Sequence, residues 1–560
     1  MNRYTLFVAS LSLLVMACAD KAPHKQAHKH HDSSAVTVGS ARAELEHEAA
    51  SDLAMSSGPA SFRKSVSQKF ALYPTAPSAF ADREHYLAFE QNGVQRSAEQ
   101  PVSTFSIDVD TAAYSNVRRM LQQEGRLPPS HAVRIEEMIN YFDYNYPQPG
   151  NAHPFSVSTE LAPSPWHAQR QLLQIGIKAF EQESETRPAA NLVFLVDVSG
   201  SMQAPNKLGL VKKSLRMLTR QMNKNDRIAL VAYAGAAGLA LPSTSAHERS
   251  RIFQAIDSLT AGGSTNGSAG ILLAYEQAKQ HYIEDGINRV IIASDGDMNV
   301  GTVDLDALKD LIAEKRKSGI SLTTLGFGTG NYNYALMEQL ADTGNGNAAY
   351  IDNLSEAQKV LVQQMNATLL TVASDVKVQI EFNPKQVAEY RLIGYENRLL
   401  QREDFSNDQV DAGDIGAGHT VTALYEITPS SASHRQIADL RYEKNTTKHS
   451  ETDVNGELAY VKLRYKRPGK SRSIELQQVV NPLDNEPALA DASDNLRFAA
   501  SVAGFGGLLS GGRYSNNWTF DDALELARGA RGKDPHGYRG ELIRLVELAQ
   551  SFSEHPKDSG

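Results

Sequence analysis

The chain has 560 residues and a mass of 61.2 kDa, with 41% hydrophobic and 22% charged residues. This composition excludes a polytopic membrane protein, a collagen and a wholly disordered chain, and the length predicts roughly three or four domains. The formal charge of −9 provides no basic field of the kind that binds nucleic acid, and a single cysteine excludes a disulfide within the chain.

The first 18 residues have the pattern of a secretion signal. Arg3 precedes an uncharged run at 4–17, which is shorter than the roughly 20 residues that a membrane-spanning helix needs. The run ends at Cys18, and the segment VMAC at 15–18 resembles the lipobox of bacterial lipoproteins. The resemblance implies that Cys18 carries lipid and anchors the protein in the bacterial cell envelope, on the periplasmic side of either membrane or on the outer surface. The alternative is a secreted protein with an incidental cysteine.

A tether is predicted next, over residues 19–80. Ala, Ser, Lys and His dominate this stretch, and apolar periodicity is absent until Phe62. Such a composition buries too little apolar surface to offset the entropy of ordering the chain, so we expect disorder.

Residues 81–180 are predicted to form an α+β segment. Its expected elements are a strand at 103–110, helices at 111–125 and 131–142, and two strands within 153–180. Asp108 and Asp110 suggest a cation site, but the sequence favours the polar face of an edge strand for this pair.

From 190 to 370 short apolar runs alternate with amphipathic stretches. Strands are expected at 191–199, 226–234, 238–243, 288–296, 320–328 and 347–352, and helices at 207–222, 250–259, 268–283, 305–319, 333–344 and 355–369. Continuous apolar strands separated by helices predict a doubly wound α/β domain with a mainly parallel sheet, and 238–243 is expected at an antiparallel edge. Ligands of such sheets bind beyond the carboxyl ends of the strands, where the strand order switches.

After this domain, in residues 371–555, the apolar period changes to two. Strands are expected at 373–384, 387–395, 419–429 and 458–468, a loop at 401–418, and helices at 495–511 and within 520–554. We expect the strands of 153–180 to pair with these later strands in one antiparallel β-sandwich. The α/β domain is then an insertion in the sandwich, and the C-terminal helices cap the assembly.

Oxygen-bearing side chains gather at the carboxyl edge of the predicted parallel sheet. Asp197, Ser199 and Ser201 follow its first strand at a spacing of two, Asp295 ends its fourth strand, and Thr265 lies in a glycine-rich loop before a helix. Carboxylates and hydroxyls without His or Cys are the donors that hard cations prefer. The sequence therefore predicts a Mg²⁺ site, with Mn²⁺ or Ca²⁺ as alternatives.

The DxSxS turn, the loop threonine and the strand-end aspartate resemble the metal-ion-dependent adhesion site of von Willebrand factor type A domains. The whole of 190–370 is similar to such a domain. The resemblance implies that Ser199 and Ser201 bind the metal directly and that Thr265 does so in the ligand-engaged form. It also implies that Asp197 and Asp295 act mostly through water.

Two further segments, STFSIDVDTAAYSNVRRML and VRIEEMINYFDYNYP, are similar to the N-terminal segment of the YfbK-like von Willebrand domain lipoproteins of bacteria. This resemblance implies the order signal, spacer, N-terminal segment, metal-site domain and C-terminal domain.

With both aspartates acting through water, the ion keeps an open coordination position. An acidic group of a protein or surface-polymer ligand is expected to fill it in a charge-assisted contact. We expect a binding protein rather than an enzyme, with no nucleic-acid partner. The alternatives are an envelope scaffold whose metal is structural and, less favoured, a metal-assisted hydrolase, for which Asp297 is the one candidate base at this edge.

Overall fold

The structure is a computed structural model. It describes residues 84–150, 152–183, 186–264, 267–296, 305–438, 456–482 and 488–554. The predicted signal segment, Cys18 and the tether lie outside the described residues. Within the described ranges, no helix combines the length and the apolar character that crossing a lipid bilayer requires.

Residues 190–369 form the α/β domain around a six-stranded sheet with the order β10-β9-β8-β5-β6-β7. Its strands are β5 (Ala190–Asp197), β6 (Arg227–Tyr233), β7 (Ala237–Ser245), β8 (Ile287–Ser294), β9 (Ser321–Phe327) and β10 (Ala348–Ile351). All pairs are parallel except β6 with β7, so the predicted antiparallel edge strand is confirmed. The central strand β5 is buried along its whole length because helices cover both faces.

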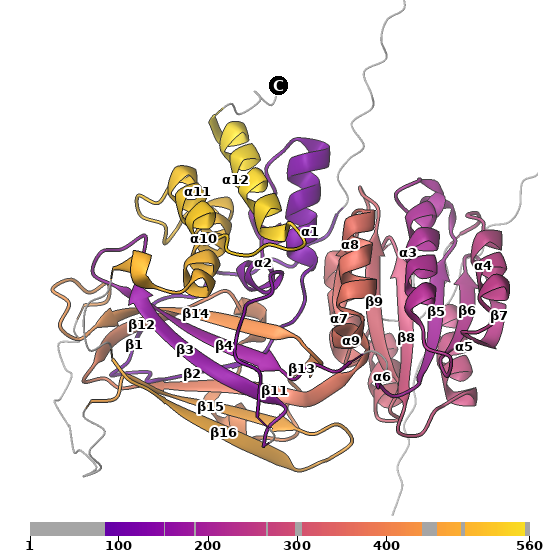
Figure 1. The fold of residues 1–560 in the computed structure, drawn as a ribbon, viewed down its shortest axis with the longest axis horizontal. Coiled ribbons are helices and arrows are strands. Elements are labelled where there is room, and N and C mark those ends of the chain that lie inside the picture. Colours follow the sequence, from indigo (N-terminus) through magenta and orange to yellow (C-terminus); the bar gives the residue numbers. More distant parts are fainter. Residues whose placement is uncertain are drawn as a thin grey trace, which may run out of the picture. The chain divides into compact units, whose positions relative to one another are not determined.

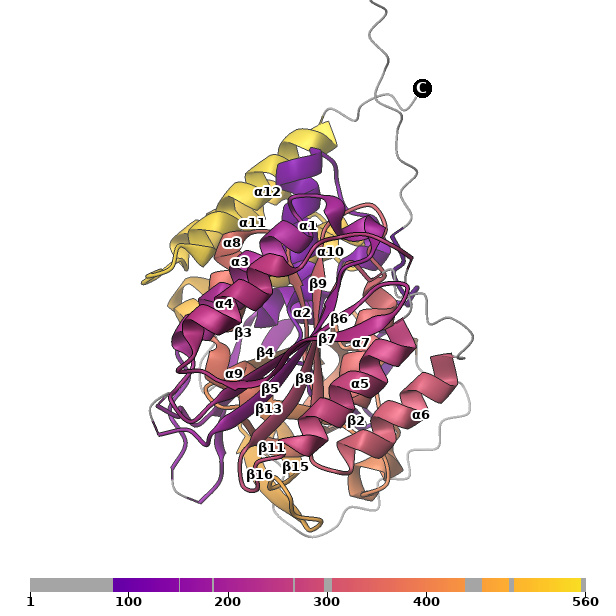
Figure 2. The ribbon, with the colours of Figure 1, turned by 90° about the vertical axis from the view of Figure 1, so that its right-hand side faces the viewer.

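The helices of this domain divide between the two faces of the sheet (Figures 1 and 2). They are α3 (Leu208–Gln221), α4 (Arg249–Ser258), α5 (Gly267–Gln280), α6 (Leu305–Arg316), α7 (Tyr334–Thr343), α8 (Leu354–Gln358) and α9 (Met365–Leu369). Apolar side chains of α3, α4, α8 and α9 pack with one face of β5, and those of α5, α6 and α7 pack with the other. The doubly wound prediction is therefore confirmed.

The structure does not have the single helix predicted at 355–369, because the helix is interrupted. A π-helical turn, η4 (Lys359–Gln363), separates α8 from α9, and α9 leads directly into a sandwich strand. Within the turn, Lys359 Nζ donates to the carbonyl of Tyr141 (2.7 Å), which lies outside the α/β domain. This tertiary contact accompanies the interruption, and a helical period of apolar residues carries no sign of it.

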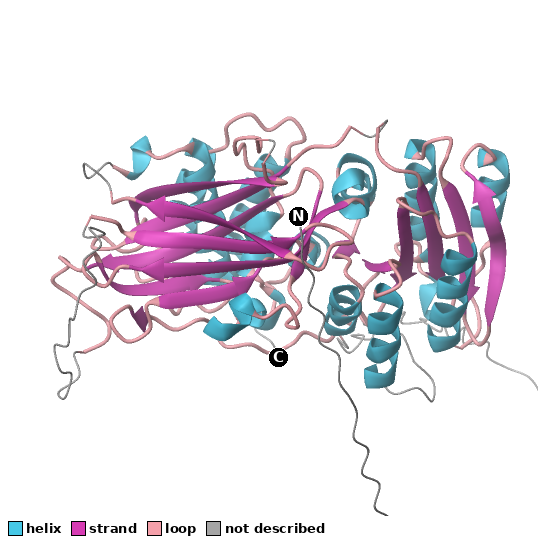
Figure 3. Cartoon of the chain, turned by 90° about the horizontal axis from the view of Figure 1, so that it is seen from below, coloured by secondary structure: helices cyan, strands magenta, loops and turns pink. Residues whose placement is uncertain are grey.

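The sandwich consists of two antiparallel sheets that share one core. One sheet has the order β1-β12-β14-β4-β3; the other has the order β13-β11-β15-β16, with β2 also paired to β11. The strands are β1 (Gln95–Arg96), β2 (Val102–Ser106), β3 (Phe155–Pro163), β4 (Gln171–Ala179), β11 (Thr371–Phe382), β12 (Val387–Ile393), β13 (Gly413–Gly416), β14 (Thr420–Pro429), β15 (Ala459–Lys466) and β16 (Ser473–Val480). Figure 3 shows these strands as a group separate from those of the α/β domain.

Strands from both sides of the α/β domain in the sequence lie in one sheet. β4 precedes that domain and pairs with β14, which follows it, from Gln171 opposite Ile427 to Lys178 opposite Thr420. The expected insertion of the α/β domain in an antiparallel sandwich is thereby confirmed.

A third group of helices packs on the outer face of the β4–β14 sheet. It comprises α1 (Ala112–Arg119), the π-helical turn η1 (Met120–Glu124), α2 (Ile135–Asn140), α10 (Asp494–Leu509), α11 (Phe520–Gly529) and α12 (Tyr538–Glu554). Leu172 of β4 and Leu424 of β14 belong to the same apolar core as these helices. The two ends of the described chain therefore build one cap, with α10, α11 and α12 above the sheet in Figure 1.

The interpretation of Asp108 and Asp110 as the polar face of an edge strand is wrong. β2 ends at Ser106, and both aspartates are only 3% exposed. Arg398, which is 290 residues away from Asp108 in the sequence, donates to both carboxylates. Alternation along a strand predicts which side chains share a face, but it does not reveal that a distant loop covers that face.

Candidate metal-binding site

Asp197 and Asp295 follow neighbouring strands of the parallel sheet. Asp197 is the last residue of β5, and Asp295 comes directly after β8. The chain passes from β5 to β6 on one side and returns to β8 on the other, so the strand order switches here. Both carboxylates thus lie at the edge where doubly wound sheets bind ligands.

The carboxylate of Asp197 is buried and held by three hydrogen bonds. Its Oδ1 accepts the backbone N–H of Ser199 (2.9 Å), and its Oδ2 accepts the hydroxyls of Ser294 (2.9 Å) and Tyr233 (3.2 Å). Burial raises the pKa of Asp197, and the Ser199 N–H opposes this rise. These contacts fix the orientation of the carboxylate.

The two predicted serine ligands lie side by side. Ser199 Oγ and Ser201 Oγ are 2.9 Å apart. Ser199 is buried. A single turn of 3-10 helix, η3 (Gly200–Gln203), starts directly after Ser199 and contains Ser201. The structure therefore brings the predicted Asp-Ser-Ser set together on one turn.

The glycine-rich loop lies against this turn. The Gly200 N–H donates to the carbonyl of Gly263 (3.0 Å), and the Gly262 N–H donates to the carbonyl of Val198 (2.8 Å). Thr265, the predicted third hydroxyl ligand, lies outside the described residues.

Asp295, the other predicted carboxylate of the site, contacts Lys207, a residue that the sequence did not single out. Lys207 Nζ donates to Asp295 Oδ2 (2.9 Å) and to Asn331 Oδ1 (2.7 Å), and Asn331 Nδ2 donates to Asp295 Oδ2 (3.1 Å). Lys207 occupies the N-cap position of α3. A cation is unfavourable there because the helix N-terminus is itself positive. The carboxylate of Asp295 offsets this cost, and no local sequence pattern indicates a partner so far away along the chain.

The donor set fits a hard divalent cation, with one qualification that concerns charge. Asp197, Ser199 and Ser201 offer only oxygen atoms, the ligands that Mg²⁺, Mn²⁺ and Ca²⁺ share. Asp295 is paired with an ammonium group, so its negative charge is already partly compensated. An ion at this edge would be held by Asp197 and the two serines, and Asp295 would be shared with Lys207.

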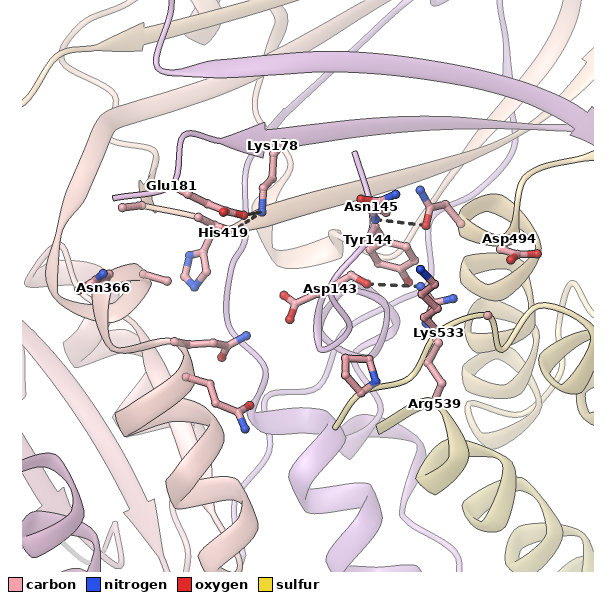
Figure 4. Close-up of a pocket in the computed structure, with 18 of the residues that line it drawn as sticks. Asp143, Tyr144, Asn145, Lys178, Glu181, Asn366, His419, Asp494, Lys533 and Arg539 are labelled. Carbon is pink, nitrogen blue, oxygen red and sulfur yellow. Dashed lines mark hydrogen bonds and ion pairs between the residues drawn. The ribbon is translucent and has the colours of Figure 1, made fainter. Parts of the chain in front are cut away.

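A polar cavity of about 1070 Å³ lies elsewhere (Figure 4). Its lining comes from the segment after α2, the end of β4, the η4–α9 region, the residues just before β14 and the segments around the starts of α10 and α12. Lys178 forms an ion pair with Glu181 (2.8 Å) at its wall, and Arg539 donates to the carbonyl of Asp143 (3.3 Å). Among the predicted metal-site residues that the structure describes, none lines this cavity. Its lining residues are scattered in sequence, so no local pattern indicates it.

Three family models match the chain. The model described as uncharacterized protein YfbK, C-terminal, matches residues 367–552; the model described as von Willebrand factor matches 80–174; and the von Willebrand factor type A domain model matches 191–368.

Several curated proteins are similar in sequence. The uncharacterized protein YfbK of Escherichia coli K12 is 47% identical over 476 residues, which cover 84% of this chain and 81% of that protein. The uncharacterized protein sll0103 of Synechocystis is 29% identical over 209 residues, covering 37% of this chain and 48% of that protein. Human inter-alpha-trypsin inhibitor heavy chain H3 is 28% identical over 261 residues, which cover 42% of this chain and 28% of that protein.

Two solved structures match most of the chain, at low overall similarity. A von Willebrand factor type A protein from Catenulispora acidiphila is 15% identical and covers 72% of this chain and 91% of its own, with a TM-score of 0.38. The ArnB paralog VWA2 from Sulfolobus acidocaldarius is 16% identical, and the match covers 71% of this chain and 98% of that chain, with a TM-score of 0.35.

Proposed function

The chain belongs to the YfbK-like family of bacterial von Willebrand factor type A domain proteins, and from this premise we propose a specific binding function. Its type A domain supports a protein-interaction role of the adhesion type. The proposal is that Mg²⁺, held by Asp197, Ser199 and Ser201, mediates capture of a ligand that carries an acidic group. Thr265 and Asp295 complete the proposed site.

The observation that carries this proposal is the pair of serine hydroxyls beside a fixed carboxylate at the switch point of the sheet. When bound there, the ion supplies a positive centre with an open position for a carboxylate of the ligand. The protein's own groups orient the donors: the Asp197 carboxylate is fixed by Tyr233 and Ser294, and the hydroxyls sit on one short turn.

The proposed setting is the bacterial cell envelope. Cys18, in its lipobox-like context, is the proposed lipid attachment point, and the tether at 19–80 would hold the folded part away from the membrane. The proposed ligand is a protein or a surface polymer.

Replacing Ser199 and Ser201 together by alanine tests the proposal. We expect capture of the ligand from envelope extract in Mg²⁺ to fall at least tenfold, because two of the direct oxygen donors are lost, while the fold is retained. Capture is measured on immobilised full-length protein in Mg²⁺ and in EDTA, and Ser258→Ala, an exposed serine of α4, serves as the matched control. Capture that survives both EDTA and the double substitution would contradict the proposal.

The second candidate function is a scaffold whose ligands bind away from the metal site. Two observations favour it: the Lys207 ammonium already pairs with Asp295, and a polar cavity lies elsewhere in the fold. Under this alternative, chelation leaves capture unchanged. Substitutions at the cavity wall, such as Lys178→Met, reduce it instead.

Lys207 gives a further expected result. Its ammonium repels a divalent ion and competes for Asp295, so Lys207→Met is expected to tighten Mg²⁺ binding about tenfold. Isothermal titration calorimetry measures the effect, and Lys213→Met, which removes an exposed lysine of the same helix, is expected to change little. Equal or weaker binding by Lys207→Met would mean that the lysine orients Asp295 for the ion rather than opposing it.

A further inference from the structure

A second group of carboxylates lies buried outside the predicted metal site. Asp108 and Asp110 follow β2, and Glu136 and Glu137 lie in the first turn of α2; we call these four residues the acidic cluster. All four are 3% exposed or less. Asp108, Glu136 and Glu137 each contribute one carboxylate oxygen to a set whose members all lie within 4.8 Å of one another.

Three members of the cluster have hydrogen-bond donors. Asp108 accepts from the Asp110 N–H (3.0 Å) and from Arg398 Nε (3.2 Å). Asp110 accepts from the Ala348 N–H (2.8 Å) and from Arg398 (3.3 Å). Glu137 accepts from the Ala113 N–H (2.8 Å) and from the hydroxyl of Tyr334.

Glu136 is different, because neither of its carboxylate oxygens has a hydrogen-bond partner although the side chain is fully buried. Its nearest cationic contact is Arg134 NH1, at 4.0 Å. Gly394 makes room for the carboxylate, since a Cβ at that position would lie 2.7 Å from Glu136 Oε2. A buried charge without donors is costly, so this carboxylate requires either a bound cation or a bound proton.

The surrounding charges do not balance the cluster. Glu338 and Asp342 of α7 extend the network by accepting from Arg134 (3.3 Å) and Arg398 (2.7 Å), respectively. Six carboxyl groups therefore face two guanidinium groups in this network of the described chain. The missing positive charge requires either bound cations or bound protons.

We propose that Asp108, Glu136 and Glu137 bind one hard divalent cation, Ca²⁺ in preference to Mg²⁺. Calcium–oxygen distances are about 2.4 Å, so oxygens around a single ion are at most about 4.8 Å apart. The three carboxylate oxygens lie within that limit of one another. Mg²⁺ retains several water molecules in an octahedral shell and suits a buried set of protein oxygens less well. The carboxylate oxygens that accept one hydrogen bond each keep a second lone pair for the ion.

The position of the site gives the ion a structural consequence. Asp108 continues from a sandwich strand, and Glu136 and Glu137 belong to the helical cap. Glu137 also accepts a hydrogen bond from the hydroxyl of Tyr334, at the start of α7 in the α/β domain. An ion here therefore cross-links the sandwich, the cap and the inserted domain, independently of the Mg²⁺ site proposed above.

Bound protons are the alternative to a cation. Burial, followed by the charge of Glu396, raises the pKa of Glu136 to about 8, so without an ion a bound proton can neutralise this group. The two alternatives differ in their response to Ca²⁺, which the experiment exploits.

The test uses full-length protein carrying Ser199→Ala and Ser201→Ala, so that the proposed Mg²⁺ site does not contribute. We expect calorimetric titration with Ca²⁺ to give one ion per chain, and Tb³⁺ to show luminescence sensitised by nearby tyrosines such as Tyr334. Adding Glu136→Gln to this background is expected to weaken Ca²⁺ binding at least 30-fold, whereas Glu381→Gln, an exposed glutamate of β11, is expected to leave it unchanged.

Melting temperatures separate loss of binding from loss of folding. In EDTA, Glu136→Gln is expected to melt at the same temperature as its parent or higher, because it removes an uncompensated acid. In Ca²⁺ only the parent is expected to gain several degrees. The absence of a bound Ca²⁺ in the parent, or a Glu136→Gln variant that binds Ca²⁺ as tightly as the parent, would overturn the proposal and leave protons as the balancing charge.

Discussion

Replacing Arg118 by methionine is expected to lower the free energy of unfolding by about 3–5 kcal/mol. Arg118 lies in α1 and is 1% exposed. Its guanidinium donates to Asp352 (Nε–Oδ2, 2.9 Å), to Glu356 (2.8 Å) and to Glu541 (3.0 Å). Asp352 and Glu356 are buried, so the substitution leaves two carboxylates without their cation in a region that excludes water.

This arginine, which lies in the cap, also connects the cap with the inserted domain. Asp352 follows β10 of the inserted domain, Glu356 belongs to α8, and Glu541 belongs to α12 of the cap. We therefore expect the substitution to loosen the attachment of the inserted domain as well as to lower stability.

Urea denaturation measures the loss, and limited proteolysis between β10 and β11 reports on the attachment. Arg126→Met is the matched control, because Arg126 is 37% exposed and an ion pair at the surface contributes about 1 kcal/mol or less. A loss below 1 kcal/mol for Arg118→Met would show that the two carboxylates take up protons or water when the arginine is absent.

Periodicity predicted most of the fold because most strands and helices bury one face. β15, with the sequence AYVKLRYK, alternates regularly between buried and half-buried positions, which is the pattern that a sandwich strand leaves in its sequence. β16 is an edge strand whose residues, apart from the last, are half-buried or exposed, so its apolar signal is weak. β13 has two glycines in four residues and lay in the stretch predicted as a loop, and its pairing with β11 is a tertiary effect.

The same distinction explains the sites. Asp197, Ser199 and Ser201 were predictable because they are adjacent in sequence and follow a recognisable strand. The contact of Lys207 with Asp295 joins residues 88 apart, and the contact of Arg398 with Asp108 joins residues 290 apart. No local pattern encodes such pairs, and for that reason the alternation at Asp108 and Asp110 indicates only the polar face of a strand.

Lys359 leads to the second expected result, which is a pH dependence. It is 1% exposed, its Nζ donates to the carbonyl of Tyr141, and the ammonium lies 3.4 Å from the centre of the Tyr141 ring. Burial lowers the pKa of Lys359 from 10.5 to about 8. The charged and titratable groups around it are Glu356, Asp143, Arg118, Glu541, His419 and the two tyrosines Tyr141 and Tyr538.

The sign of the effect follows from proton binding. Between pH 8 and 10.5 the unfolded chain keeps the Lys359 proton and the folded chain releases it, so raising the pH through this range favours the folded state. Relative to Lys359→Met, the wild type is expected to gain up to about 3 kcal/mol of stability across this range, because each pKa unit corresponds to about 1.4 kcal/mol. The difference between the two proteins isolates Lys359, since tyrosines and other lysines titrate in both.

Denaturant titrations of wild type and Lys359→Met at pH 7, 8, 9 and 10 measure this difference, with Lys213→Met as the exposed-lysine control. A difference that stays constant with pH would mean that the Tyr141 carbonyl and ring stabilise the ammonium enough to offset its burial. The interrupted helix would then be held to the cap by a charged lysine at every pH tested. A rising difference would instead mean that burying the Lys359 ammonium destabilises the folded protein at neutral pH. The contact between the inserted domain and the cap would then depend on Arg118, which donates to Glu356 of α8.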